Sequence, residues 1–532
     1  MTRYRKLLAL TQPAEGGSVT RDGLLAGTTG AAVLLASLVN FLAYQHYPLL
    51  RPEIGIVVLA LLALAAAVGF VYAVSGPLVR LLLQIYLVVV AVDLNTDGFV
   101  AVAAAVAILI VFNRHAMLFL RVTSVIVAVT ALVTASSGPG GGSAVAAAGD
   151  GPSDRPAILH LILDEHIGIE GILGDQPDHA GLREELKSFY LDNGFRLFGG
   201  AYSEYFRTVN AIPQMLNFGR LQPWTDRASE RHSMNENAYF DRLGELGYRV
   251  RVLQTDFLDY CGHPAVADCR SERAANVSAI IGSRMTAPQK AWLIGLLLAN
   301  RSGMLWVGLD TYDIMAIMAR RYGLSWPRAT YEIPNFGARA ALNNLAGELS
   351  QARPGDAFFV HALLTHAPYL LNRDCRLREG WRDHVGETAE QREHAYLEQV
   401  SCATSKVRAA LDALASSPAG ANAIVIVHGD HGSRASENGD AKTSFTDEEL
   451  VAGYSTLFAI RAPGLAAGYD PRPLPAWALL KAAAEAGFAA VEPRIDPGQT
   501  PSVMQEDADW KPVDRRALPQ WWLDRLAAAP SG

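Results

Sequence analysis

Acidic and histidine side chains stand at the ends of three separate apolar runs in this sequence. The run 157–163 (AILHLIL) leads directly into Asp-Glu-His, and the run 357–362 (AFFVHA) is followed by a histidine. The run 423–427 (AIVIV) leads into His-Gly-Asp-His-Gly. One acidic residue at such a place is usually a helix cap, but three run ends of this kind are not explained by capping. The residues with metal-ligating side chains are Asp164, Glu165, His361, His366, His428, Asp430 and His431.

Carboxylate oxygens and imidazole nitrogens together are typical of divalent metal sites. We therefore predict a metal centre that uses zinc or manganese, with magnesium and calcium as further candidates.

The three runs are typical of buried parallel strands, because each is continuously apolar and short. Ligands gather beyond the carboxyl ends of such strands in open α/β sheets. Two further strands are expected over 249–253 and 455–462, and a helix over 388–414. Alternating strands and helices predict a doubly wound, mostly parallel α/β sheet.

A candidate nucleophile lies in the segment 202–218 (YSEYFRTVNAIPQMLNF), where Thr208 precedes Pro213 by five residues. A threonine hydroxyl is a poor nucleophile unless a base or a dication activates it. In the alternative interpretation, Thr208 caps a helix that begins near Ile212. Both interpretations are compatible, since a helix N-terminus also favours an anion.

The first 135 residues are nearly all apolar, in five segments that approach the ~20 residues of a membrane-spanning helix. The N-terminal tail carries Arg3, Arg5, Lys6 and Arg21, which favours a cytosolic N-terminus. Five crossings would then place the rest of the chain outside the cytosol. The expected segments are 24–45, 54–75, 77–93, 98–113 and 115–135.

The expected organisation is a five-helix transmembrane bundle over 1–135, a Gly/Ser/Ala/Pro linker over 136–156 and an α/β domain over 157–532. Half of all residues are apolar, which excludes a disordered chain. The net charge of −7 argues against a nucleic-acid binder.

All four cysteines lie in the α/β part, where the natural pairs are Cys261–Cys269 and Cys375–Cys402. Four cysteines allow three connectivities, and four reduced buried thiols are the alternative. We expect disulfides, which fits a domain outside the cytosol. The apolar stretch 291–299 (AWLIGLLLA) is too short to span a membrane. We expect a buried core helix there, with a helix lying on the lipid surface as the alternative.

Four short stretches carry a resemblance to a known family. LHLILDEH contains Asp164, with Glu165 as the competing ligand, and RTVNAIP contains Thr208 in a T-x-x-A-I-P version of a T-x-x-S-[IV]-P pattern. HALLTHAPY has two histidines five residues apart, and IVIVHGDHGSR contains Asp-His-Gly. Together with the five apolar segments, they resemble the sulfatase-like branch of the alkaline phosphatase superfamily. The similarity is greatest to membrane-anchored phosphoethanolamine and phosphoglycerol transferases, including lipoteichoic acid synthases.

The resemblance implies an enzyme that moves a phospho-head group from a membrane phospholipid to an envelope glycan or lipid through a phospho-threonine. It implies one divalent ion on Asp164, Thr208, Asp430 and His431, with His366 and His361 as catalytic histidines. It also implies a bacterial plasma membrane protein with a periplasmic catalytic domain.

The sequence departs from the family pattern at several places. Where phosphoethanolamine transferases have a further histidine after Asp-His-Gly, this chain offers Lys442. Glu165, His428 and Arg434 are further candidate site residues outside the pattern. No C-x-P-x-R or S-x-P-x-R motif surrounds Thr208, which argues against a sulfatase. A phosphodiesterase or phosphatase that uses water, and a catalytically inactive envelope-binding scaffold, are the alternatives.

Overall fold

The computed structural model divides into two compact units, and each is described by itself. One unit lies within 1–144 and 277–332, and the other lies within 145–276 and 333–532. The described residues are 19–44, 47–92, 116–136, 155–174, 176–221, 232–255, 257–272, 286–301, 334–376, 378, 387–436, 444–494, 500–507 and 510–530.

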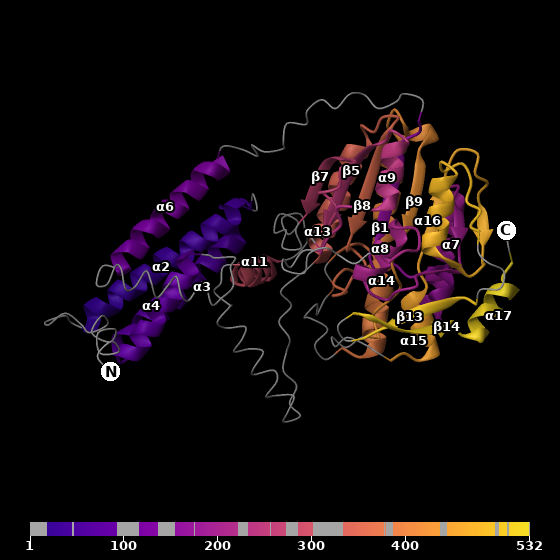
Figure 1. Ribbon diagram of the computed structural model, residues 1–532. Coiled ribbons are helices and arrows are strands. Elements are labelled where there is room, and N and C mark those ends of the chain that lie inside the picture. The colour runs from indigo at the N-terminus through magenta and orange to yellow at the C-terminus, as the bar shows by residue number, and fades with distance from the viewer. Residues whose placement is uncertain are drawn as a thin grey trace. The chain divides into compact units, whose positions relative to one another are not determined.

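The helical unit contains α2 (Val19–Tyr44), α3 (Pro52–Val74), α4 (Pro77–Val92), α6 (Ala116–Ser136) and α11 (Ala287–Arg301) (Figure 1). Helix α2 packs against α3, α4 and α6. A Cβ on Gly69 of α3 would lie 2.7 Å from the carbonyl oxygen of Gly23 and 2.9 Å from Cα of Gly27. Such close approach of two backbones is typical of small residues at membrane helix interfaces.

Two of the described helices are long and apolar enough to cross a membrane, over Arg21–Ala43 and Pro52–Val74. The apolar helices over Pro77–Val88 and Leu120–Thr130 are shorter. The expected segment 98–113 and nearly all of the expected linker lie outside the described residues. The five-helix bundle therefore stays a prediction.

The α/β unit is built on an eight-stranded sheet of order β11-β2-β10-β9-β1-β8-β5-β7. All neighbouring strands in it are parallel except that β10 runs antiparallel to both β9 and β2. The strands are β1 (Ile158–Leu163), β2 (Arg196–Phe198), β5 (Arg249–Thr255), β7 (Val266–Glu272), β8 (Asp356–Ala362), β9 (Ile424–His428), β10 (Phe458–Arg461) and β11 (Gly468–Asp470). The expected mostly parallel sheet is confirmed by this pairing.

Helices cover both faces of the sheet (Figure 1). Leu159, Leu161 and Leu163 of β1 belong to one buried cluster, with residues of α7 (Pro177–Asp192), α13 (Pro334–Leu349) and α14 (Ala389–Ala415). Ile158 and Ile162 belong to the other, with α8 (Thr208–Leu216), α9 (Ala238–Glu245) and α16 (Ala476–Glu485). Strand β1 is continuously apolar because both of its faces are buried.

A smaller buried cluster lies around the C-terminal part of the chain. It joins α15 (Asp447–Tyr454), the antiparallel hairpin β13 (Ser502–Glu506)–β14 (Pro512–Ala517) and α17 (Gln520–Ala528) to Phe206, next to the candidate nucleophile. Both expected disulfides are present, Cys261–Cys269 and Cys375–Cys402.

One helix differs from its expectation. Helix α11 does not join the core of the α/β unit; it packs against α3, and to a smaller extent against α2, within the helical unit.

Candidate active site

The ends of three adjacent strands bring the sequence-predicted residues together. Strand β1 pairs with β8 and β9 on its two sides, and Ile162 of β1 lies level with both His361 and His428. Asp164, which follows β1, therefore meets His361 of β8 and the Asp430-His431 pair that follows β9. All of these side chains are fully buried.

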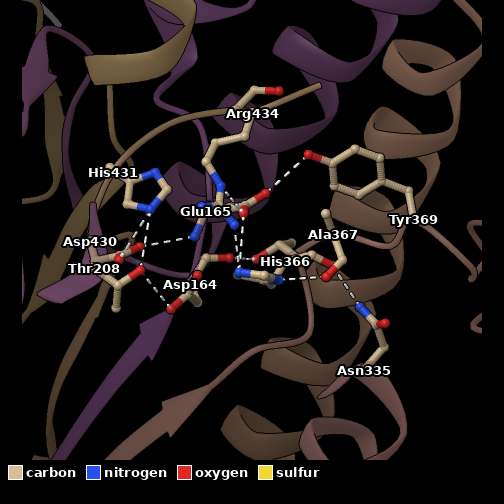
Figure 2. A network of polar contacts seen from close by, with 12 residues as sticks. Asp164, Glu165, Thr208, Asn335, His366, Ala367, Tyr369, Asp430, His431 and Arg434 are labelled. Atoms are coloured by element: carbon tan, nitrogen blue, oxygen red, sulfur yellow. Dashed lines mark hydrogen bonds and ion pairs between the residues drawn. The ribbon is translucent and has the colours of Figure 1, made fainter. Parts of the chain in front are cut away.

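Thr208 is the first residue of α8, and its side chain points into this group (Figure 2). Its Oγ1 lies 3.3 Å from Asp164 Oδ2 and 3.3 Å from His431 Nε2. The capping interpretation is wrong, because α8 begins at Thr208 rather than near Ile212 and its N-cap is Arg207, without a side-chain cap. The hydroxyl is thus directed at the acidic residues and not at the helix backbone.

The donor atoms of Asp164, Asp430 and His431 suit a divalent cation. One ligand atom from each lies within 4.8 Å of the others. His431 Nδ1 lies 2.9 Å from the carbonyl oxygen of Gly432, which only accepts. Nδ1 therefore carries the proton and Nε2 presents its lone pair to the site. Asp164 Oδ1 and Asp430 Oδ2 are buried and have no hydrogen-bond partner among the described residues.

The charge balance of this cluster also favours a cation. Burial, followed by the negative charge of Asp430, raises the pKa of Asp164 to about 7. Two buried carboxylates close together repel each other unless a proton or a cation lies between them. A bound divalent ion would reverse the shift, since it favours the ionised carboxylate.

A second polar cluster lies beside the first and is complete in itself (Figure 2). Glu165 Oε1 accepts a hydrogen bond from Arg434 Nε at 2.5 Å, and Oε2 accepts one from the Tyr369 hydroxyl at 3.0 Å. Burial would raise the pKa of Glu165, but the charge of Arg434 and the nearby histidines outweigh it and lower the pKa to about 2. Glu165 is therefore an ionised carboxylate with its counter-ion already present.

The backbone separates these two neighbouring carboxyl groups. Glu165 adopts a left-handed conformation with φ of 62°, which costs a non-glycine residue roughly 1–2 kcal/mol. Its N–H donates to Asp430 Oδ1 at 2.9 Å, and its carbonyl oxygen accepts from the Tyr396 hydroxyl at 2.5 Å. Strained backbone held by buried partners is common at functional sites.

The two candidate catalytic histidines have different surroundings. His361 Nε2 lies 3.1 Å from Asp164 Oδ2, and burial lowers the pKa of His361 to about 4. His366 is partly exposed; its Nδ1 lies 2.5 Å from the carbonyl oxygen of Ala367, and its Nε2 lies 2.6 Å from a nitrogen of Arg434. A guanidinium only donates, so His366 Nε2 accepts in this arrangement.

His428 is not brought into either cluster. Its Nε2 lies 2.6 Å from Nε2 of His160, and its ring stacks on Phe458. Burial lowers the pKa of His428 to about 4. The pair is a buried contact between neutral rings beneath the site. Lys442 lies outside the described residues.

Sequence reasoning missed the groups that hold the site residues in place. Tyr369 and Tyr396 hold Glu165, and Glu506 of the C-terminal hairpin accepts from the backbone N–H of Phe206 at 2.8 Å. Tyr369 stands in the HALLTHAPY stretch, but no spacing links Tyr396 or Glu506 to the strand ends.

Comparisons with known proteins found similarity only among solved structures. No family model matches the chain, and no curated protein matches it. The C-terminal periplasmic domain of EcEptC from Escherichia coli, in complex with Zn, is 12% identical over 68% of this chain and 94% of that chain, with a TM-score of 0.38.

Two sulfatases are similar to a comparable extent. BT1596, a 2-O GAG sulfatase, is 14% identical over 65% of this chain and 73% of that chain, with a TM-score of 0.38. The putative sulfatase yidJ from Bacteroides fragilis is 14% identical over 68% and 83%, with a TM-score of 0.39.

Proposed function

We propose that this chain is a metal-dependent enzyme that transfers a phospho-head group, of the phosphoethanolamine or phosphoglycerol type, from a membrane phospholipid to an envelope glycan or lipid. The observation that carries the proposal is the position of Thr208. Its hydroxyl is buried at the first residue of α8 and lies 3.3 Å from both Asp164 Oδ2 and His431 Nε2. A hydroxyl held among ligands at a helix N-terminus meets the requirements of an activated nucleophile facing an anion.

Asp164, Asp430, His431 and the Thr208 oxygen would hold the divalent ion. When bound, the ion would lower the pKa of the Thr208 hydroxyl and neutralise charge on the phosphoryl oxygens. Three oxygen ligands and one imidazole suit zinc or manganese.

In the first half-reaction, Thr208 Oγ1 forms a bond to phosphorus and the bond from phosphorus to the diacylglycerol oxygen breaks. The threonine proton leaves to the solvent, because the bound ion would lower the pKa of that hydroxyl. Once Arg434 has released it, His366 Nε2 takes up a proton from the solvent and donates that proton to the leaving oxygen. This role requires Arg434 to release His366 Nε2, and a phosphoryl group would attract the guanidinium because the pairing is bidentate and charge-assisted.

In the second half-reaction, the hydroxyl of an envelope glycan or lipid attacks the phospho-threonine. Its oxygen forms the new bond to phosphorus, the bond to Thr208 Oγ1 breaks, and the proton of the acceptor returns to the enzyme. Water in place of that hydroxyl would give a phosphodiesterase with the same first step.

The rest of the chain supports a membrane-bound substrate. Two helices of the helical unit are long and apolar enough to cross a membrane. Both disulfides lie in the α/β unit, which favours an extracytoplasmic compartment such as the periplasm. An active site tethered in this way would meet a phospholipid donor without a soluble carrier.

The test is the intact mass of the full chain after incubation with Mn²⁺ or Zn²⁺ and vesicles of phosphatidylethanolamine or phosphatidylglycerol. We expect a gain of one phospho-head group on the wild type and none on Thr208→Ala. Thr208→Ser should regain the adduct. Thr404→Ala is a matched control, since Thr404 is buried on α14 and its hydroxyl contacts only the Val400 carbonyl.

An adduct that persists in Thr208→Ala would overturn the assignment of the nucleophile. Diacylglycerol release without any adduct, lost in Thr208→Ala, would favour fast transfer to water. Absence of both products, with no metal retained by the wild-type protein, would favour the scaffold alternative.

A further inference from the structure

Helix α11 is encoded between two elements of the α/β unit but packs elsewhere. It follows β7 and precedes α13 in the chain. Its packing partners among the described elements are α3 and, to a smaller extent, α2. The chain therefore leaves the α/β unit after β7, contributes one helix to the helical unit, and then returns.

One side of α11 is buried in that packing. Ala291, Ile294 and Leu298 are at most 5% exposed, and they recur at the i, i+3 and i+7 spacing of one helix face. Trp292 points away from this face and is 66% exposed. The sequence 291–299 contains no charged side chain.

The partner of α11 is itself a candidate membrane span with exposed apolar side chains. Helix α3 is long and apolar enough to cross a membrane over Pro52–Val74. Its Leu59 is 68% exposed and its Phe70 is 69% exposed. A helix that lies on such a span shares its surroundings. The exposed Trp292 of α11 and the exposed apolar side chains of α3 are both of the kind that lipid acyl chains cover.

The dimensions of α11 fit one leaflet. Its apolar run of nine residues extends about 13 Å at 1.5 Å per residue, against a hydrocarbon core of ~30 Å. Lys290 stands at one end of the run, and a long basic side chain can reach the interface from such a place. Trp292 is of the type that anchors helices at a membrane surface.

Helix α11 meets α3 at the start of α3. Lys290 lies close enough to Glu53, at the start of α3, to interact with its carboxylate. The end of α3 is followed directly by α4, whose Arg80 lies 3.7 Å from Asp22 near the start of α2. The start of α2 and the Lys290 end of α11 thus lie at opposite ends of α3, as expected if they face opposite sides of a membrane.

We propose that α11 is a monotopic membrane segment, which inserts from the outer surface into one leaflet beside α3 and attaches the stretch of chain between β7 and α13 to the membrane. This inference concerns attachment and does not depend on the reaction proposed above. In this proposal, lipid covers the exposed side of α11. The test must distinguish this cover from one formed by a second copy of the chain.

The test uses the full chain in phosphatidylcholine/phosphatidylglycerol vesicles with one introduced thiol. All four native cysteines form disulfides, so Trp292→Cys would carry the only free thiol. Ala409→Cys, on the exposed side of α14, is the matched control in the α/β unit. Pro288→Cys, exposed four residues before Trp292 on the same helix face, is a second variant in case Trp292→Cys does not fold.

We expect Cys at 292 to react with a charged maleimide at least about tenfold more slowly than Cys at 409, because the leaflet excludes the reagent. An environment-sensitive fluorophore at 292 or 288 should be quenched by phospholipids brominated on their acyl chains, and one at 409 should not. Equal reaction rates without quenching would overturn the proposal. Slow reaction without quenching, or crosslinking between copies through 292, would show a protein cover and overturn it as well.

Discussion

Two polar clusters lie side by side at the strand ends, and they differ in how their charges are balanced. Around Glu165, the charge of Arg434 and the hydroxyl of Tyr369 satisfy both carboxylate oxygens. Around Asp164 and Asp430, no arginine or lysine contacts the carboxylates among the described residues, and one oxygen of each has no hydrogen-bond partner. Neighbours in sequence thus have opposite pKa shifts, with Asp164 raised to about 7 and Glu165 lowered to about 2.

This difference separates a cluster that is complete from one that requires a cation. A buried carboxylate without a partner is costly, and a protein keeps such a group where a ligand supplies the missing charge. We therefore propose Asp164 as the metal ligand and Glu165 as the residue that holds Arg434 and His366. The following experiments test this division.

The largest effect is expected from removing one charge of each cluster in turn. Asp430→Asn should weaken metal binding by well over 100-fold, because loss of a direct ligand exceeds the ~10–100-fold typical of outer-shell residues. Glu165→Gln should retain one metal ion per chain. Metal content by mass spectrometry after dialysis distinguishes the two. Loss of metal in Glu165→Gln with retention in Asp430→Asn would reverse the assignment.

The pH dependence of stability should be opposite for the two carboxyl groups. In chelator-treated protein, the raised pKa of Asp164 adds stability that is fully present below pH ~4. This contribution is lost as the pH rises through about 7, and it amounts to at most about 4 kcal/mol. Urea unfolding at pH 4 to 8 should show this loss in the wild type and a much smaller one in Asp164→Asn. Added metal should abolish it.

The lowered pKa of Glu165 adds stability above pH ~4.5 that is lost as the pH falls toward about 2, by up to about 3 kcal/mol. Arg434→Met should remove most of this acid sensitivity, because it removes the counter-ion of Glu165. Unfolding midpoints at pH 5 and pH 3 measure the change. Equal acid sensitivity in Arg434→Met and the wild type would contradict the pairing.

The two histidines of His-Gly-Asp-His provide a matched pair for a smaller effect. His431→Gln should lose metal. His428→Gln should keep metal and turnover but lower the free energy of unfolding by about 1–3 kcal/mol, since His160 would lose its buried partner. Metal content and urea unfolding of both variants check this. Metal loss in His428→Gln would place that ring in the site.

The smallest effect is expected at the C-terminal hairpin. Glu506 accepts from the Phe206 N–H and contacts Asn210, and burial raises its pKa to about 7. Glu506→Gln should slow turnover by less than about tenfold and cost about 1 kcal/mol, with metal retained. Asp514→Asn, exposed on the same hairpin, is the control and should change neither.

Much of the α/β unit was predictable because its signals are local. Strands β1, β8 and β9 appear as apolar runs, since a strand buried on both faces needs no polar positions. Helix α14 was predictable in the same way, because Thr388 and Gln391 form a capping box at its start. The short β2 and β11 and the polar β7 were missed, because three residues or a polar composition carry no such signal.

The sequence by itself determined which residue types stand at the strand ends, and so predicted ligands, a nucleophile and two disulfides. Only the tertiary structure showed which partners surround each of these residues, with Arg434 beside Glu165 and His160 beside His428, and it placed α11 beside α3. The reason is physical. Strand and cap signals act over a few residues, whereas the partner of a buried charge can come from a distant segment, as Arg434 does for Glu165 at a separation of 269 positions.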